Sequence, residues 1–251
     1  MIPKKIHYCW FGGNPLPKSA EKCLKSWEKY CPDYEIVRWD ESNFDINCNE
    51  YCKAMYEQKK WAFLTDYSRL KIVFENGGIY FDTDVELIKS PDEVLSNRAF
   101  MGLETTNHVA TGLGFGAEKN HPFIRKNMEY YEKLSEFDDI RICPDVTTEL
   151  FEQYGIDCES DDIQKLADVT IYPVDFFCAK HTHTGIVSIT SNTISIHHFD
   201  GSWMSEEMQN KTKRRWREHK KQYIMQAPKR LLRKIVGDGV VDNIKKQLLK
   251  K

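Results

Sequence analysis

Two carboxylates one residue apart, Asp82 and Asp84, follow a short apolar segment in Gly77-Gly-Ile-Tyr-Phe-Asp-Thr-Asp84. Side chains two positions apart on an extended chain point in the same direction, so both carboxylates are expected to reach one object. Hard divalent cations prefer carboxylate oxygens, and a diphosphate binds such a cation. The pattern therefore predicts a metal site for a nucleotide diphosphate at a strand end. Acidic turns without a ligand have the same pattern, so the prediction depends on other residues.

Three residues nearer the N-terminus are candidates for binding a nucleotide sugar. Trp10 ends the first apolar segment beside Gly12-Gly13, where an aromatic ring can stack on a nucleobase. A buried core tryptophan is the alternative. Asp66 and Arg69 lie three positions apart on a predicted helix. They therefore share one face of that helix, among apolar positions. Such a pair can hold sugar hydroxyls, and the alternative is a surface ion pair of little energetic value.

A late segment, Ile196-His-His-Phe-Asp-Gly-Ser-Trp203, supplies a further group of polar side chains after a predicted strand. Histidine nitrogen is a ligand that Mn²⁺ accepts beside carboxylates, which makes His197 and His198 candidates. Ser202 and Trp203 carry a hydroxyl and an indole N–H, which are donors suited to phosphate oxygens. Histidines near a strand end also occur as purely structural residues, so this segment gains meaning only beside the Asp82–Asp84 pair.

The elements expected around these residues alternate between strands and helices, which indicates an α/β fold. Strands are expected at 2–11, 34–39, 77–81, 85–87, 100–103, 112–117, 169–172 and 193–197. Helices are expected at 19–30, 60–76, 121–134 and 144–154, and from residue 205 onwards. The first strand–helix–strand unit predicts a parallel strand pair. The glycines of 112–117 indicate a strand that another backbone or a ligand approaches closely.

Length and composition predict one domain of ordinary-to-large size, or one domain with an appendage. The chain has 251 residues, of which 41% are hydrophobic, which is enough for a sizeable core. No apolar segment approaches the roughly 20 residues of a membrane-spanning helix. The N-terminus lacks a signal-peptide pattern, and the eight cysteines form no Cys-x-x-Cys pair. These features favour a cytoplasmic protein with reduced thiols.

The net charge of −2 conceals a strong asymmetry. Residues 211–251 contain 15 Lys/Arg and three acidic residues, a net charge of +12, which leaves −14 for the rest. We therefore expect a catalytic domain at 1–204 and a basic helical tail at 205–251. The tail has two interpretations: a helix that lies on an anionic membrane surface, or a solvated basic helix that packs on the acidic domain. The first would give a peripheral location at the inner face of the plasma membrane.

Four stretches together resemble the glycosyltransferases of family 32, whose sugar-binding region contains an Asp-x-Asp motif and which include capsular polysaccharide and lipopolysaccharide enzymes. They are also similar to the catalytic domain of the large clostridial glucosylating toxins. The matching stretches, in the family's order, are residues 2–13, 62–70, 77–85 and 197–203. The resemblance implies a GT-A fold, with a Rossmann-like mixed sheet flanked by helices. It also implies a nucleotide-sugar donor and a divalent metal ion, Mn²⁺ or else Mg²⁺.

The resemblance assigns roles on the sugar and nucleobase side of the donor. Trp10 matches the aromatic residue that stacks on the base, and Asp66 and Arg69 match the pair that holds the donor sugar. A family loop with a Gly-Pro…Thr pattern corresponds to Pro144-Asp-Val-Thr147, although Cys143 replaces the glycine. That replacement leaves an acceptor-side role of Asp145 open.

On the metal side, Asp84 matches the direct metal ligand, and Asp82 matches the residue shared between ribose and the metal shell. His197 looks like the late metal ligand, and His198 is the second candidate for that position. Ser202 and Trp203 match the pair that touches the β-phosphate. The catalytic residues implied by the resemblance are Asp66, Arg69, Asp82, Asp84 and Trp203.

The chemistry follows from charge. Departure of a nucleoside diphosphate builds negative charge on the β-phosphate, which a cation and the donors of Ser202 and Trp203 would stabilise. The resemblance implies retention of anomeric configuration. Because we identify no carboxylate placed as a covalent nucleophile, we expect front-face attack assisted by the leaving phosphate. A glycosyl-enzyme adduct or an inverted product would contradict this expectation.

The expected function is transfer of a hexose from a UDP-sugar to a glycan or lipid-linked oligosaccharide in surface polysaccharide synthesis. UDP rests on analogy, with galactose as the first choice and glucose as the second. A GDP-mannose-dependent mannosyltransferase is the enzymatic alternative. A nucleic-acid-binding protein would use the basic tail, but it lacks a recognition fold and the acidic domain would repel nucleic acid. A metal-dependent phosphohydrolase would need more clustered carboxylates.

Overall fold

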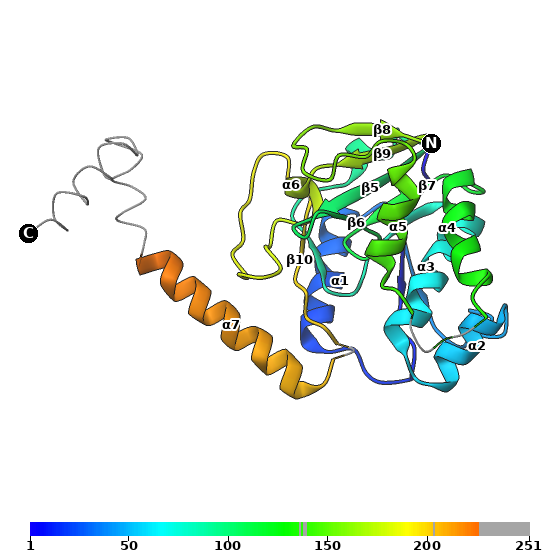
Figure 1. Ribbon diagram of the computed structural model, residues 1–251, viewed down its shortest axis with the longest axis horizontal. Coiled ribbons are helices and arrows are strands. Elements are labelled where there is room, and N and C mark those ends of the chain that lie inside the picture. Colours follow the sequence, from blue (N-terminus) through cyan, green and yellow to red (C-terminus); the bar gives the residue numbers. More distant parts are fainter. Residues whose placement is uncertain (136, 138–139, 203, 226–251) are drawn as a thin grey trace, which may run out of the picture. The chain divides into compact units, whose positions relative to one another are not determined.

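A computed structural model of the chain describes residues 1–135, 137, 140–202 and 204–225 (Figure 1). These residues fall into two units, of which the first comprises residues 1–182 and 187–203. The second comprises residues 183–186 and the chain from residue 204 onwards. The expected division into a catalytic domain at 1–204 and a tail at 205–251 stays a prediction.

One mixed sheet forms the centre of the first unit, with the strand order β2-β1-β3-β7-β5-β9-β8 and β6 paired to β5. Its strands are β1 (Lys5–Cys9), β2 (Glu35–Trp39), β3 (Gly78–Tyr80), β5 (Ala99–Glu104), β6 (His108–Ala110), β7 (Phe115–Ala117), β8 (Gln164–Leu166) and β9 (Val169–Tyr172). Strand β1 is parallel to β2 and β3, whereas β7 is antiparallel to β3 and β5. The α/β class is therefore confirmed, as a mixed sheet flanked by helices of the kind that a GT-A fold requires. The predicted parallel pair at 2–11 and 34–39 is also confirmed.

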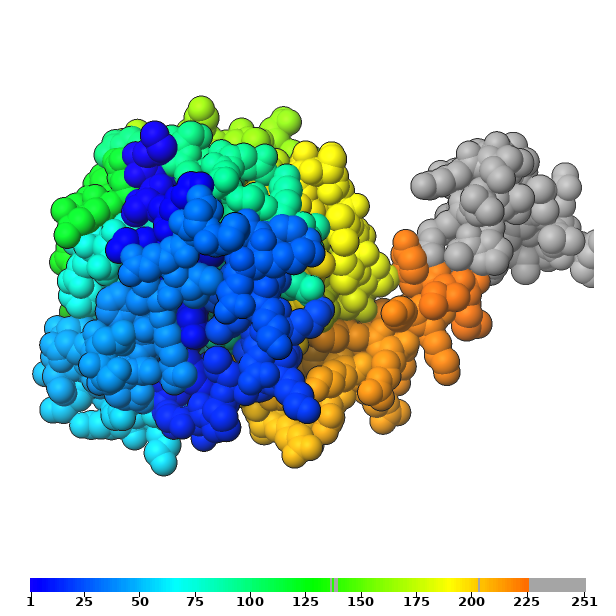
Figure 2. All heavy atoms as spheres, turned by 180° about the vertical axis from the view of Figure 1, so that it is seen from behind, coloured from blue at the N-terminus to red at the C-terminus, as the bar shows by residue number. Residues whose placement is uncertain are grey.

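Helices cover both faces of this sheet (Figure 1). They are α1 (Lys18–Tyr30), α2 (Glu50–Glu57), α3 (Trp61–Asn76), α4 (Pro122–Glu132), α5 (Cys143–Glu152) and α6 (Val174–Phe177), with a short 3₁₀ turn η1 (Asp92–Val94). One apolar core contains side chains of α2, α3, α4 and α5, and a second contains side chains of α1 and α6. Seen from behind, the blue N-terminal residues that include α1 cover much of the first unit (Figure 2). Because both faces are covered, β1 is buried along most of its length.

A separate two-stranded antiparallel sheet pairs β4 (Val85–Leu87) with β10 (Ser195–His197). Helix α1 holds this small sheet through Trp27, which is fully buried. The indole N–H of Trp27 donates to the carbonyl of Val85 at 2.8 Å. The ring of Trp27 also packs on Phe81, with 5.7 Å between the ring centroids. Trp27 therefore fixes the chain on both sides of the Asp82-Thr-Asp84 segment.

The sequence interpretation missed α2 and overextended β7. Asn49 caps α2 by accepting a hydrogen bond from the Cys52 N–H at 2.7 Å, and an asparagine before a helical apolar pattern is a signal that could have revealed the helix. The predicted strand at 112–117 is wrong for residues 112–114, because only Phe115–Ala117 pairs in the sheet. The backbone at Gly114 has a φ of +134°, which lies outside strand geometry.

The second unit contains α7 (Glu206–Met225), which confirms the helix expected from residue 205. Gly185 lies against this helix, because a Cβ added to Gly185 would approach Trp216 to 2.6 Å. The remainder of the predicted tail, from residue 226 onwards, lies outside the described residues. Within those residues, no helix combines the length and the apolar character that crossing a bilayer demands.

We expect the substitution Trp27→Phe to destabilise the first unit. It keeps an aromatic ring but leaves the buried carbonyl of Val85 without its donor, which costs about 1–3 kcal/mol. Urea denaturation followed by circular dichroism measures this change. The exposed Lys25 on the same helix provides the control, and Lys25→Ala should stay within about 0.5 kcal/mol of the wild type. Equal stabilities of Trp27→Phe and the wild type would contradict the role given to this hydrogen bond.

Candidate functional site

The Asp82-Thr-Asp84 segment forms the turn between β3 in the large sheet and β4 in the two-stranded sheet. The backbone N–H of Asp82 donates to the carbonyl of Gly112 at 3.1 Å, and the N–H of Val85 donates to the carbonyl of Asp82 at 3.0 Å. A Cβ added to Gly112 would approach the Asp82 carboxylate to 2.3 Å. A side chain at residue 112 would therefore displace the Asp82 carboxylate, and the hydrogen bond between the Asp82 N–H and the Gly112 carbonyl confirms the close backbone approach expected of this glycine-rich segment.

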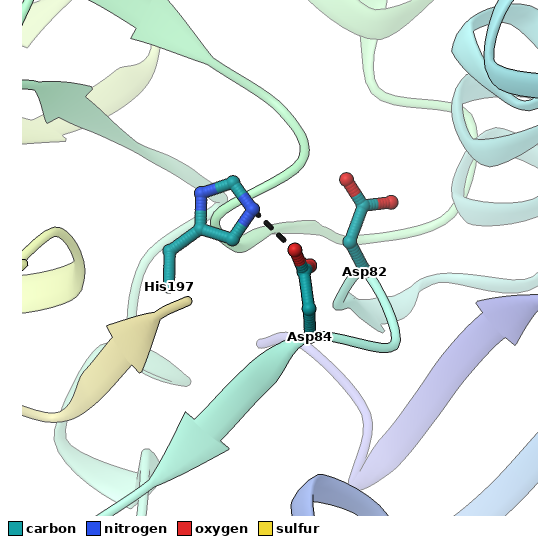
Figure 3. A group of neighbouring side chains, drawn as sticks. All are labelled: Asp82, Asp84 and His197. Carbon is teal, nitrogen blue, oxygen red and sulfur yellow. Dashed lines mark ion pairs between the residues drawn. The ribbon is translucent and has the colours of Figure 1, made fainter. Parts of the chain in front are cut away.

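His197 reaches this turn because of the strand register in the two-stranded sheet. Strand β10 pairs His197 with Val85, the residue that follows Asp84. The His197 Nε2 lies 3.2 Å from an Asp84 carboxylate oxygen. Asp82, Asp84 and His197 offer ligand atoms that all lie within 4.8 Å of one another. Figure 3 shows the imidazole facing Asp84, with the Asp82 carboxylate beside them.

The charges of these three side chains are strongly coupled. Burial opposes ionisation of Asp84, but His197 and the N–H of Asp200, which donates to Asp84 at 2.9 Å, hold the pKa of Asp84 at about 2. Burial would lower the pKa of His197, yet Asp84 and Asp82 outweigh it and raise that pKa. Two carboxylates and an imidazole are a donor set that suits Mn²⁺. A divalent cation would take the place of the imidazolium proton as the charge that balances the carboxylates.

Asp66 and Arg69 lie beside this cluster and are buried, at 8% and 5% exposure. The Arg69 guanidinium lies 3.0 Å from Asp66 and 3.5 Å from Asp82, so it joins the sugar-binding candidates to the metal-binding candidates. This confirms that the pair lies at the buried edge of α3 and excludes the surface ion pair. Burial raises the pKa of Asp66 to about 6 although Arg69 opposes the rise. Burial likewise raises the pKa of Asp82 against Arg69.

Three further residues hold the charged pair, and the sequence interpretation gave none of them this role. The Tyr80 hydroxyl donates to Asp82 at 2.9 Å, and the Arg69 guanidinium lies 5.2 Å from the centre of the Tyr80 ring. Thr111 and Cys143 contact the Arg69 guanidinium at 3.4 and 4.0 Å. Tyr80 could have been found from its place two residues before Asp82. Thr111 and Cys143 carry no local signal, because only the fold brings them to α3.

The remaining candidates lie in different surroundings. His198 turns to Glu86, with 2.8 Å between His198 Nε2 and the carboxylate, whereas His197 faces Asp84. Trp10 is half-buried and its indole N–H donates to the carbonyl of Asn14 at 2.6 Å. Ser202 is exposed, and Trp203 lies outside the described residues.

Asp145, whose acceptor-side role is open, lies in the first turn of α5. Its carboxylate is 3.4 Å from His108 Nε2, and both side chains are partly exposed. Cys143, which replaces the glycine of the family pattern, is instead buried against Arg69. The roles implied for all these residues stay predictions.

Residues 17–101 match the model of a family described as a glycosyltransferase sugar-binding region containing a DXD motif. This stretch includes Asp66, Arg69, Asp82 and Asp84.

Similar proteins include an inositol phosphoceramide mannosyltransferase 3 of Schizosaccharomyces pombe, 30% identical over 49% of this chain and 35% of that protein. A human alpha-1,4-N-acetylglucosaminyltransferase is 28% identical over 47% of this chain and 33% of that protein. The solved structure of PaToxG glycosyltransferase has a TM-score of 0.47 and 21% identity over 61% of this chain and 69% of that chain. The matches thus span about a third of the two curated relatives. The stretch that contains the aspartates is therefore similar to the sugar-binding region of glycosyltransferases that contain a DXD motif.

Proposed function

We propose that this protein is a metal-dependent glycosyltransferase that transfers a hexose from a nucleotide sugar to a glycan or lipid-linked acceptor. The observation that carries the proposal is the continuous set of charged side chains formed by the buried Asp66 and Arg69 and the partly buried Asp82, Asp84 and His197. Arg69 joins the first two carboxylates at 3.0 and 3.5 Å, and Asp82 lies within 4.8 Å of the ligand atoms of Asp84 and His197. The pair proposed to bind the sugar is therefore adjacent to the group proposed to bind the metal, which supports transfer from a nucleotide sugar.

The site residues divide into groups with different tasks in the proposed reaction. Asp84 and His197 would hold the cation, with Asp82 shared between the cation and the ribose. The bound cation supplies electrostatic stabilisation of the diphosphate. Asp66 and Arg69 would orient the donor sugar through its hydroxyls, Trp10 would stack on the base, and Ser202 with Trp203 would donate to the β-phosphate. We propose retention through front-face attack, in which the leaving phosphate accepts the proton of the acceptor hydroxyl.

The donor is proposed to be a UDP-sugar, with galactose first and glucose second, and the acceptor to belong to surface polysaccharide synthesis. GDP-mannose is the second candidate, because one similar protein is named a mannosyltransferase. Another is named an N-acetylglucosaminyltransferase, so similarity alone does not select the sugar. Hydrolysis of a series of UDP- and GDP-sugars with Mn²⁺ tests the choice directly. Preference for GDP-mannose would replace the UDP proposal and leave the transferase proposal intact.

The basic tail is proposed to bring the protein to an anionic membrane, at the cytoplasmic face. Helix α7 contains seven Lys/Arg against three Glu. Its exposed apolar side chains are Met208, Tyr223, Ile224 and Met225. Cations interleaved with bulky apolar residues are typical of helices that bind an anionic interface. Such contact would place the enzyme close to a lipid-linked acceptor.

We expect Asp84→Asn to abolish Mn²⁺-dependent binding of nucleoside diphosphate. The substitution removes a charged ligand, so the affinity for UDP or GDP with Mn²⁺ should fall by at least about 100-fold in calorimetry. Asp168→Asn is the matched control, because Asp168 is 62% exposed and pairs with Arg98 at the surface. The control should bind as the wild type does. Retention of metal-dependent binding by Asp84→Asn would refute the metal site.

Asp66→Asn should separate sugar handling from nucleotide binding. The substitution preserves size but removes the carboxylate that pairs with Arg69, so donor turnover should fall by about 100-fold through misplacement of the sugar. The affinity for the nucleoside diphosphate itself should stay near that of the wild type. Kinetics with the preferred nucleotide sugar and calorimetry with its nucleoside diphosphate measure the two effects. Equal losses in both would argue against a role confined to the sugar.

A chain that ends at residue 210 should leave the membrane while it keeps donor hydrolysis. The truncation removes most of α7 and the net charge of +12 that follows. In vesicle sedimentation, the full chain should bind vesicles containing an anionic lipid and not neutral vesicles, and high salt should release it. The truncated chain should bind neither. Unchanged binding after truncation would disprove the membrane role of the tail.

A further inference from the structure

Lys180 lies at the loop that closes over Asp84. This loop, residues 198–201, follows β10 and is attached to Asp84 at two points. The His198 N–H donates to the Asp84 carbonyl at 2.9 Å, and the Asp200 N–H donates to the Asp84 carboxylate at 2.9 Å. The Lys180 ammonium donates to the carbonyl of His198 at 2.5 Å. A lysine from a distant part of the chain thus places its charge on the loop that surrounds the candidate metal ligand.

The surroundings of Lys180 are acidic and poorly solvated. The side chain is half-buried, and burial lowers the pKa of its ammonium while the charges of Asp200 and Asp84 oppose that change. The negative charges of both aspartates therefore reach the ammonium. A lysine ammonium is a compact charge on a flexible stem, so it can shift towards a nearby anion without a change in the backbone.

The proposed reaction needs positive charge at this place. A nucleotide-sugar diphosphate brings two negative charges, and Asp82 and Asp84 bring two more. A divalent cation balances only half of them. When the bond between the anomeric carbon and the β-phosphate oxygen breaks, its electron pair stays on the phosphate and adds negative charge. The acceptor oxygen forms the new bond to the anomeric carbon, and its proton passes to the leaving phosphate.

We propose that Lys180 binds the diphosphate of the donor and stabilises the charge that develops as the nucleoside diphosphate leaves. The proposal rests on the proposed function and adds a residue that neither the motifs nor the sequence comparison assigns. Two other basic side chains lie next to this cluster. Arg69 pairs with Asp66 at 3.0 Å, and Lys22 pairs with Glu86 at 2.9 Å. Glu86 also contacts His198 Nε2 at 2.8 Å, so Lys22 lies near the loop at residues 198–201 as well.

The test compares ligands that differ only in phosphate. Lys180→Met keeps the length of the stem and removes the charge, and Lys180→Arg keeps the charge. Uridine, UMP and UDP, and the matching guanosine series, are titrated with Mn²⁺ in a calorimeter. Loss of a charged hydrogen bond should weaken UDP or GDP binding to Lys180→Met by about 10-fold or more, with the nucleoside unaffected. Lys180→Arg should restore most of the affinity, and kcat should fall in Lys180→Met.

Control measurements separate this role from a structural one. Lys165→Met changes an exposed lysine on β8 and should bind every ligand as the wild type does. Thermal unfolding and Mn²⁺ titration without nucleotide should be the same for Lys180→Met and the wild type. Equal UDP affinity in Lys180→Met would overturn the proposal. A loss of Mn²⁺ affinity without nucleotide would also overturn it, because Lys180 would then act by holding the loop.

A failure of the proposed function gives a different result. If the wild type binds neither UDP nor GDP with Mn²⁺, the transferase proposal falls, and this proposal falls with it. If the wild type binds one of them and Lys180→Met binds it equally well, only the role of Lys180 is lost.

Discussion

The buried guanidinium of Arg69 is the charge on which the arrangement of the site depends. It lies between two carboxylates, Asp66 on its own helix and Asp82 on the turn after β3, at 3.0 and 3.5 Å. Removing one partner of a buried ion pair leaves an uncompensated charge that costs about 3–5 kcal/mol. The three charges therefore require one another, and they tie α3 to the Asp82-Thr-Asp84 turn. Tyr80 and Thr111 contact the same group and restrict its orientation.

A second constraint comes from the two-stranded sheet of β4 and β10, which joins segments more than a hundred residues apart in sequence. Its register sets His197 opposite Val85, and Trp27 of α1 holds the carbonyl of Val85. Asp84 therefore has a fixed neighbour on the strand side and a loop around its carboxylate. Asp84 and His197 stabilise each other's charged form. A divalent cation that replaced the imidazolium proton would therefore keep the carboxylates neutralised. The same loop accepts a hydrogen bond from Lys180 through the carbonyl of His198.

Sequence patterns were least informative where backbone approach, and not apolar periodicity, decides the structure. The glycine-rich segment at 112–117 has strand-like composition, but its first residues leave the sheet because Gly112 passes directly beside Asp82. Helix α2 was missed because it is short, although Asn49 caps it. The helices at 19–30 and 60–76 were predicted well, since each repeats apolar residues at helical spacing over several turns.

The sequence by itself determined the α/β class, the long helices, and the candidates Asp66, Arg69, Asp82, Asp84 and His197, because periodicity and motif spacing are local properties. It also indicated that Asp82 and Asp84 act on one object, since alternate side chains of an extended chain share a direction. Only the tertiary structure decided that His197 faces Asp84 while His198 turns to Glu86. It alone brought Thr111, Cys143 and Lys180 to the charged cluster. Contacts between distant segments depend on strand register and helix packing, which no local pattern encodes.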